Sequence, residues 1–312
     1  MASFLPDILA LFFLMALVCQ RLGVNLQLPN DAYQLLTYVL LITIGLKGGQ
    51  ALAYSANWAL LGQSISVIML GVLVTLVAML LIGTFSKLNT IDKTTLAAHY
   101  GSVSVGTYAV AISFLQLREI EFEPQIALFV ALLELPAIIF GLAYLSRKQG
   151  QKGFDLRTIF AHKSLALIVI GMLIGALYGE VAEPMVKNLK PIFAVMLALY
   201  LIHMGALAGQ RLSDLSSNHM FIISFGITMP VLGAIMGLTL GYWLGLSVGG
   251  LTLLATLAAS ASYIAVPAVF EQAQPKANIA QALVASLAIT FSFNVIWGIP
   301  LYAHAADIIS RL

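Results

Sequence analysis

The stretch Leu41-Ile42-Thr43-Ile44-Gly45-Leu46-Lys47-Gly48-Gly49-Gln50-Ala51-Leu52 returns without a gap as Leu201-Ile202-His203-Met204-Gly205-Ala206-Leu207-Ala208-Gly209-Gln210-Arg211-Leu212. Identical Leu, Ile, Gly, Gly, Gln and Leu residues fall at a constant offset of 160 positions. The same offset places Glu134 over Asn294, and an offset of 158 places Ser102-Val103-Ser104 over Ser260-Ala261-Ser262. The chain therefore reads as two related halves, and in an apolar protein such weak internal symmetry is typical of secondary transporters.

The composition indicates that most of this chain is surrounded by lipid. Its 312 residues are 61% hydrophobic and 9% charged, against roughly 25% charged in a soluble domain. A soluble fold does not hide this much apolar surface, so a lipid bilayer is the expected environment. The net charge of +2 gives no reason to expect a nucleic-acid partner, and the single Cys19 excludes an internal disulfide.

Ten apolar segments, five in each half, are long enough to cross roughly 30 Å of hydrocarbon. They are 3–20, 31–47, 58–85, 94–117, 124–146, 164–181, 190–210, 219–245, 247–270 and 277–303. The first lacks a basic leader and a small-residue cleavage site, so we expect it to be retained. Because each half crosses an odd number of times, the second half enters from the opposite face. This predicts an all-α membrane protein of two inverted five-helix repeats, 1–146 and 164–312, joined by the short basic connection 147–163.

The distribution of Lys and Arg predicts the orientation of the chain in the membrane. The face with the N-terminus and the even-numbered connections carries five basic residues: Lys47, Arg118, Lys187, Lys190 and Arg311. The opposite face carries ten: Arg21, Lys87, Lys93, Arg147, Lys148, Lys152, Arg157, Lys163, Arg211 and Lys276. We therefore expect both termini outside the cell, the connection 147–163 in the cytoplasm, and the protein in the plasma membrane.

The fourth and ninth segments contain polar stretches that are expected to interrupt the helix. Each has two hydroxyl residues two positions apart, followed by a helix breaker, Gly106 or Pro267. A Pro inside a helix removes a backbone hydrogen bond and clashes with the preceding turn. Unwound backbone at membrane depth is tolerated only where it lines a cavity or is buried in protein. The residues expected to contact a substrate are Gly101, Ser102, Ser104, Gly106, Thr107, Ser260, Ser262 and Tyr263.

Two interruptions related by inverted symmetry would cross near the middle of the membrane. Half-helix N-termini offer free N–H groups and a partial positive charge, which suits an anion. Free carbonyls and hydroxyls suit a hard cation such as sodium. The alternative is that Ser and Gly serve only as small residues that let helices pack closely. The symmetric pair, each with a helix breaker, favours a binding site.

Of the charged residues in the sequence, Glu134 is the one that we place in the middle of an apolar segment. A carboxylate in lipid costs at least a few kcal/mol, so a functional role is the default hypothesis. It precedes Pro136, another helix breaker, and its counterpart in the repeat is Asn294. Three roles stay open: a sodium ligand together with Asn294, Ser104 and Ser262, a proton carrier, or a hydrogen-bonded brace for the unwound segments.

Motifs of soluble enzymes are missing from the sequence. There is no phosphate loop and no Cys or His pair at metal-ligand spacing. The five His residues are scattered, and for His203, in the seventh segment, a packing role is favoured over a proton relay. We therefore expect no enzyme, no cofactor, and no metal other than transported sodium.

At these residues the chain resembles the SbtA family of sodium-dependent bicarbonate transporters. The resemblance rests on Ile44-Gly45-Leu46-Lys47-Gly48-Gly49, Gly101-Ser102-Val103-Ser104 with Thr107, Glu134-Leu135-Pro136, the Ser-rich stretch 260–267, and Gly298-Ile299-Pro300-Leu301. These motifs are specific in combination, and they follow in order along nearly the whole chain. The resemblance implies anion-site roles for Ser102, Ser104, Thr107, Ser260 and Ser262, with Glu134 at the family's carboxylate position.

The same resemblance implies a homotrimeric ten-helix carrier that takes up bicarbonate with sodium. Helices one, two, six and seven would form a gate domain and oligomer scaffold, and helices three to five and eight to ten a moving core. Two features depart from the family. Tyr263 stands where the family has an Asp, and only Pro267 remains of a Gly-Pro-Pro run. The central connection is short, which argues against binding of the family's PII-like partner.

The sequence therefore predicts a secondary transporter that moves a small anion inward with sodium by an elevator-like, alternating-access mechanism. Bicarbonate is the first choice of anion because of the resemblance alone. A carrier of larger organic acids, similar to the bile-acid symporter family, would share the fold but have a wider apolar cavity. An anion channel and an intramembrane enzyme are further alternatives.

Overall fold

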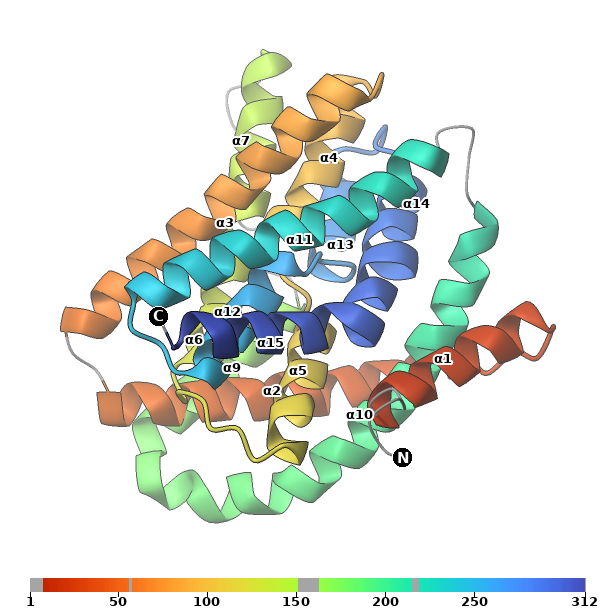
Figure 1. The fold of residues 1–312 in the computed structure, drawn as a ribbon. Coiled ribbons are helices and arrows are strands. Elements are labelled where there is room, and N and C mark those ends of the chain that lie inside the picture. The colour runs from red at the N-terminus through yellow and green to blue at the C-terminus, as the bar shows by residue number, and fades with distance from the viewer. Residues whose placement is uncertain (1–7, 56–57, 151–162, 215–218, 312) are drawn as a thin grey trace.

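The computed structural model describes residues 8–55, 58–150, 163–214 and 219–311. Every regular element in these ranges is helical (Figure 1). The α-helices are α1 (Ile8–Arg21), α2 (Asn30–Ser55), α3 (Trp58–Phe85), α4 (Thr90–Gly101), α5 (Val105–Leu117), α6 (Ile126–Glu134), α7 (Pro136–Lys148), α9 (Lys163–Tyr178), α10 (Glu183–Arg211), α11 (His219–Trp243), α12 (Val248–Ala259), α13 (Ala265–Ala273), α14 (Ile279–Leu283) and α15 (Ile299–Ile309). Two 3-10 helices, η2 (Gly179–Ala182) and η3 (Leu212–Asp214), and two π-helices, η4 (Val284–Phe291) and η5 (Asn294–Gly298), complete the described elements.

Seven helices in the described part of the chain are long and apolar enough to cross a membrane. They are Asn30–Ala53, Trp58–Phe85, Ile126–Lys148, Ala166–Leu189, Pro191–Arg211, Met220–Trp243 and Ile279–Ile309. Three other segments were expected to cross. The first corresponds to α1, which has 14 residues, and the fourth and ninth are each divided into two shorter helices, α4 with α5 and α12 with α13. The chain is thus a multi-pass membrane protein.

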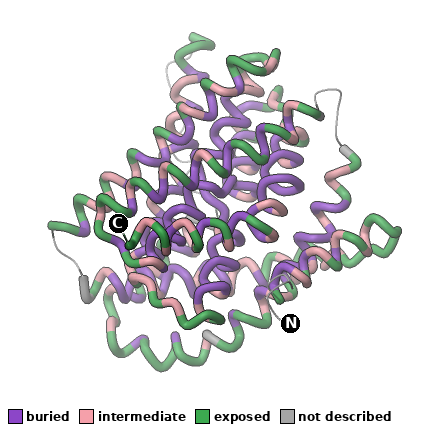
Figure 2. Tube along the Cα trace, in the orientation of Figure 1, coloured by how far each residue is buried: buried purple, intermediate pink, exposed green. Residues whose placement is uncertain are grey.

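Long apolar side chains are exposed along the outer helices, whereas the divided helices lie inside the molecule. α12 is buried from its second residue to its last, and α4 is buried from its fifth. Figure 2 shows this contrast between a buried centre and an exposed periphery. The exposed side chains include Leu61, Ile65, Met69 and Leu73 on α3, and Ile170, Leu173 and Leu177 on α9. Spacings of three or four residues put each set on one helix face, which lipid would cover.

The expected connection between the sixth and seventh segments is helical instead. α9 passes through η2 directly into α10, which begins at Glu183 and contains Pro191. Pro184 lies in the first turn of α10, where its missing N–H costs no hydrogen bond. Glu183 and Lys187 form an ion pair one turn apart, 3.9 Å long, that favours the helix. The other expected connection, 147–163, lies largely outside the described residues.

The repeated glycines make equivalent close contacts in the two halves. A side chain at Gly45 would collide with the backbone of Ile168 in α9, and one at Gly49 would collide with Met172 one turn further on. In the second half, Gly205 of α10 approaches the backbone of α1 in the same way. Close backbone approach through small residues is how membrane helices associate where no hydrophobic drive exists between them. The sequence repeat therefore corresponds to a repeat in packing.

Connections expected on the same face of the membrane contact one another. The N–H of Asn278, before α14, donates to Asp92 Oδ1, in the first turn of α4, at 2.7 Å. Elsewhere the N–H of Ser247, before α12, donates to Glu123 Oε1, before α6, at 2.5 Å. The third connection thus lies with the ninth, and the fourth with the eighth.

Candidate functional site

The first interruption is a stretch of three non-helical residues between α4 and α5. Ser102 has extended backbone angles, with φ −94° and ψ 172°, so it leaves the helix. The hydroxyl oxygen of Ser104 accepts a hydrogen bond from the Thr107 N–H at 3.0 Å. This is an N-cap, which satisfies one of the free donors of a new helix and explains why α5 starts here.

The second interruption repeats the first with two additional residues. α12 has 12 residues, as α4 does, and the caps that start them, Ser247 and Asn89, are 158 positions apart. The residues that end them, Ser260 and Ser102, are also 158 apart and are both extended. Five residues then separate α12 from α13, against three in the first interruption. This difference of two accounts for the change of offset from 158 to 160 before Asn294.

Three hydrogen bonds between buried groups hold the interruptions against each other. The Ser104 N–H donates to Ser260 Oγ at 2.9 Å. The Ser262 N–H donates to the His99 carbonyl at 2.7 Å. His99 Nδ1 lies 2.6 Å from the Ser262 carbonyl, and because a carbonyl only accepts, Nδ1 is the donor. The polar stretches of the two halves therefore meet, as the symmetry of the sequence predicted.

Helix ends of both polarities meet at this crossing. α5 and α13 begin there with partly positive N–H ends, whereas α4 and α12 end there with carbonyl groups. The hydroxyl of Ser262 accepts from the Val266 N–H at 3.3 Å, as Ser104 does from Thr107. The crossing thus offers donors for an anion and acceptor oxygens for a hard cation.

A small cavity lies between the interruptions. Its polar lining consists of Ser104, Ser262, Tyr263 and Glu134, and its volume of about 10 Å³ leaves room for about one water-sized occupant. The remaining wall is formed by Leu41, Val103, Val105, Ile264 and Ala265. Glu134 is 3% exposed, and its Oε2 finds no hydrogen-bond donor in the described parts of the chain. A buried carboxylate oxygen without a donor is costly unless a proton or a cation joins it.

Three residues expected to contact a substrate are bonded to the protein and do not line the cavity. Ser102 Oγ donates to the Glu134 backbone carbonyl at 3.0 Å, and Ser260 Oγ donates to a carbonyl of α12 at 2.8 Å. Thr107 Oγ1 donates to Ser104 Oγ at 2.8 Å. These bonds stabilise the unwound backbone, so in this structure the three hydroxyls support the site without facing the cavity.

Gly101, Gly106 and Pro267 occupy positions that differ from the expectation. A side chain at Gly101 would collide with the hydroxyl of Thr75, so this glycine permits close contact between α4 and α3. Gly106 and Pro267 lie in the first turns of α5 and α13, after the interruptions. Because the first-turn N–H groups have no intrahelical acceptor, Pro is tolerated there. Neither residue interrupts a helix; each belongs to the helix that restarts.

The expected partners of Glu134 lie nearby but have different surroundings. Pro136 begins α7, and Leu135 alone separates it from the end of α6 at Glu134. Asn294 donates to the Ala259 carbonyl at 2.9 Å and accepts from the Tyr302 hydroxyl at 2.8 Å. Both ends of this amide are therefore satisfied, and Asn294 holds the end of α12 without lining the cavity.

Two buried side chains at the crossing were not predicted as parts of the site. His99 joins the end of α4 to the second interruption, and its Nε2 has no partner among the described residues. The Tyr200 hydroxyl, from α10, lies 2.8 Å from the Tyr263 hydroxyl. The sequence marks both residues only as polar side chains inside apolar segments. Many other residues of the chain have this property, so it does not single out His99 and Tyr200.

The oxygen atoms at the crossing suit a hard cation. Among the residues that the structure describes, no three His, Cys, Asp or Glu side chains gather as metal ligands. Hard cations take oxygen ligands from carboxylates, hydroxyls and carbonyls. Glu134, Ser104 and Ser262 present such oxygens to one cavity.

Membrane-crossing helices with two interrupted segments that meet around a polar cavity are typical of membrane transporters. The profile of the Na+-dependent bicarbonate transporter superfamily matches residues 8–307, nearly the whole chain. The chain therefore belongs to this superfamily, in agreement with the resemblance drawn from its motifs. A search of curated proteins gives no match.

Proposed function

We propose that the protein takes up bicarbonate together with sodium by alternating access. Membership of a sodium-dependent bicarbonate transporter superfamily supports the choice of both ions. The donors and acceptors at the helix crossing support a site that holds an anion and a cation side by side. Glu134, Ser104 and Ser262 would bind sodium, and the N–H ends of α5 and α13 would face the anion.

The unsatisfied carboxylate of Glu134 is the observation that carries this proposal. It is buried, it lines the cavity between the interruptions, and its Oε2 has no donor in the described chain. Sodium would supply the missing positive charge, and bound sodium would in turn attract an anion to the neighbouring N–H groups. Coupling between the two ions then follows from electrostatics.

Ten crossings in two inverted repeats are part of the same proposal. The packing of helices supports it, because α1 packs on α10 and α2 packs on α9, and each pair is the counterpart of the other under the repeat. Likewise α3 packs on α4 and α11 packs on α12. In this arrangement α1, α2, α9 and α10 form the gate, and the remaining helices form the core that moves against it.

The gate would also carry the contacts of a homotrimer. Its helix α9 exposes many large apolar residues, which supports a role in helix association within the membrane. Both termini would lie outside the cell and the connection 147–163 inside, because the face that carries this connection has more Lys and Arg residues than the opposite face. Residues 151–162 of this connection lie outside the described residues, and its shortness argues against a PII-like partner.

The cavity between the interruptions admits a cation but no anion in this arrangement. About 10 Å³ accommodates about one water-sized occupant, such as a dehydrated cation. Even bicarbonate, with four heavy atoms, requires the interruptions to separate. Under the alternating-access proposal, this structure would correspond to a closed arrangement of the site.

Uptake of labelled bicarbonate into liposomes containing the purified protein tests the proposal. An inward sodium gradient should accelerate uptake, and equal uptake with and without the gradient would refute symport. Replacing both Ser104 and Ser262 by Leu should abolish uptake because both hydroxyls line the cavity. Ser66→Leu is the matched control, since the Ser66 hydroxyl bonds only to the Gly62 carbonyl of its own helix. Normal uptake by the double variant would mean that the interruptions serve only in helix packing.

A further inference from the structure

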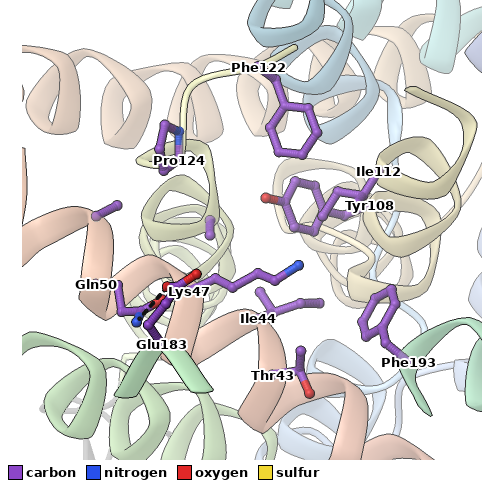
Figure 3. A pocket seen from close by; sticks show the side chains of 12 residues that line it. Thr43, Ile44, Lys47, Gln50, Tyr108, Ile112, Phe122, Pro124, Glu183 and Phe193 are labelled. Carbon is purple, nitrogen blue, oxygen red and sulfur yellow. Dashed lines mark hydrogen bonds between the residues drawn. The ribbon is translucent and has the colours of Figure 1, made fainter. Parts of the chain in front are cut away.

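A larger cavity, of about 300 Å³, lies between α2 and α10 of the proposed gate and α5 and α6 of the proposed core (Figure 3). Several of its polar side chains are engaged within the protein. Gln50 donates to the Gly179 carbonyl at 3.0 Å and to Glu183 Oε2 at 3.5 Å. The Lys47 ammonium lies 5.9 Å from the centroid of the Phe193 ring. The polar atoms that need a ligand lie elsewhere, on α4.

Two buried side chains of α4 carry polar atoms without a partner among the described residues. They are Thr95, through its hydroxyl oxygen, and His99, through Nε2. The two residues are 1% and 0% exposed, and buried polar atoms normally have a hydrogen-bond partner. The adjacent Thr94 shows the usual arrangement in a helix, because its hydroxyl donates to the Thr90 carbonyl at 2.8 Å. The two atoms therefore require another explanation.

The hydrogen bonds of His99 define what its Nε2 needs. The His99 carbonyl accepts from the Ser262 N–H at 2.7 Å, and Nδ1 donates to the Ser262 carbonyl at 2.6 Å. In a neutral imidazole with the proton on Nδ1, Nε2 is an acceptor. A second proton would charge a buried ring, which is costly unless a partner lies at Nε2, and the described chain provides none. The missing partner of His99 is therefore a hydrogen-bond donor.

Thr95 and His99 lie one helical turn apart, so their side chains are neighbours on the surface of α4. They do not bond to each other, and polar groups too far apart to bond directly are commonly bridged by water. A buried water needs at least two polar partners, and this pair supplies two. Asp92, in the first turn of α4, continues the same line and is only partly buried. A polar line thus leads from the third connection to the second interruption.

The second half of the chain shows that the fold does not require polar residues at these positions. With the offset of 158 that relates α4 to α12, Leu253 corresponds to Thr95 and Leu257 corresponds to His99. Both leucines are buried, with exposures of 0% and 1%. An apolar residue avoids the cost of an unsatisfied buried polar atom. The polar pair is thus a feature of one half alone, and a bound donor would account for it.

We propose that one water molecule is bound between Thr95 and His99, and that it positions Ser262 at the crossing. The water donates one proton to His99 Nε2 and bonds to the Thr95 hydroxyl. By occupying Nε2 it keeps the ring proton on Nδ1, the atom that holds the Ser262 carbonyl. Because Ser262 lines the cavity at the crossing, His99 is a positioning residue for that site. The effect of this water on sodium rests on the proposed function, whereas its binding does not.

Nitrogen-15 NMR of protein labelled at its histidines tests the water site, with His99→Gln to assign the signals. Nδ1 of His99 should carry the proton, and Nε2 should show an accepted hydrogen bond with transfer from water protons. Thr95→Val removes the hydroxyl at nearly constant size and should shift the Nε2 signal toward that of a free acceptor. Thr94→Val is the matched control, since this neighbouring hydroxyl bonds within its own helix, and it should leave the signal unchanged. The same Nε2 signal in Thr95→Val and the unaltered protein, or a proton on Nε2, would overturn the proposal.

Thermal unfolding in detergent gives a second measurement of the Thr95 hydroxyl. Replacing an unsatisfied buried hydroxyl by a methyl group of the same shape is neutral or stabilising, whereas removing a bonded one is destabilising. The melting temperature of Thr95→Val should therefore be lower than that of the unaltered protein. An equal or higher melting temperature would mean that the hydroxyl has no bound water.

Uptake measurements separate this inference from the proposed function. In liposomes, Thr95→Val should raise the sodium concentration for half-maximal uptake about threefold and change the maximal rate less than about twofold, because one supporting hydrogen bond is lost but no ligand is removed. Thr95→Ser keeps the hydroxyl and should restore the value of the unaltered protein. If NMR shows the water at Nε2 but a sodium gradient does not accelerate uptake, the water site stands and symport is wrong. If uptake depends on sodium and Thr95→Val changes neither this dependence nor the Nε2 signal, symport stands and the water site is wrong.

Discussion

Glu134 is the residue whose surroundings distinguish binding from support. Its backbone carbonyl accepts from Ser102, which is a structural contact, but its side-chain Oε2 faces a cavity without a donor. A brace would use the side chain to hold the unwound backbone. A cation ligand or a proton carrier would leave it unsatisfied until the ion arrives, and the absence of a donor for Oε2 among the described residues favours these two roles over a brace.

Replacing Glu134 by Gln should abolish the response of uptake to sodium and leave the fold intact. Gln keeps the size of the side chain but removes the charge that attracts the cation, and the loss of a charged ligand should weaken sodium binding about tenfold or more. The melting temperature should stay the same or rise, because an unpaired buried charge disappears. Uptake against sodium concentration and thermal unfolding in detergent measure the two effects. Unchanged sodium dependence together with a lower melting temperature would identify Glu134 as a brace.

The polar residues at the crossing could be predicted from the sequence. Which of them line the cavity and which bond to the unwound backbone could not. Ser104, Ser262, Tyr263 and Glu134 stand out as polar residues in apolar segments, and the structure brings them to one cavity. Ser102 and Ser260 have the same chemistry and turn to carbonyl partners instead. Which hydroxyl faces the cavity depends on the backbone angles of the unwound stretch, and no periodicity specifies these angles.

At the scale of the element, small residues decide which helices associate. Gly205 and Gly209 of α10 approach α1, as Gly45 and Gly49 of α2 approach α9. The lipid supplies no hydrophobic drive for these contacts, so they depend on close backbone packing. A larger side chain at one of these positions pushes two helices apart over their whole length.

Gly205→Leu should lower the stability of the protein by about 1–3 kcal/mol or more, the usual cost of overpacking. A Cβ at Gly205 would collide with the backbone carbonyl of Phe13, which cannot turn aside. Gly62→Leu is the matched control, because nothing lies within 4 Å of a Cβ at Gly62 in α3. Thermal unfolding in detergent should show a clear decrease for the first variant and little change for the second. Equal melting temperatures would mean that α1 and α10 are not held by this contact.

Helix positions could be predicted where the apolar pattern is uniform and less well where polar residues intervene. α3 has the bounds expected for its segment, 58–85, because its composition changes sharply at both ends. The passage from α9 to α10 falls between two predicted apolar segments, 164–181 and 190–210, because Glu183, Pro184 and Lys187 are poor membrane residues. They form a helix start instead, since Pro184 and an ion pair one turn apart suit a first turn.

At the scale of the whole molecule, the contacts between connections indicate how the chain alternates between two faces. Asn278 with Asp92, and Ser247 with Glu123, join connections that the proposed topology puts on common faces. The count of apolar segments in the sequence predicts this alternation, and the two contacts agree with it.

Single cysteines introduced into a Cys19→Ser background should report the orientation. Lys87→Cys and Lys276→Cys should react with an impermeant maleimide only after the cells are opened, because the basic face is expected in the cytoplasm. Arg118→Cys should react in intact cells. Labelling of all three from one side would contradict the alternation of the connections, and the reverse pattern would invert the proposed orientation.

The two additional residues of the second interruption bear on which side of the membrane the empty protein faces. In a perfectly duplicated carrier, the inward-facing and outward-facing forms would be images of each other under the repeat and would have equal free energy without ligands. A chain with unequal interruptions, three residues in one half and five in the other, lacks that degeneracy. Under the inverted-repeat proposal the empty protein therefore rests on one side of the membrane by preference, before any ion gradient acts on it.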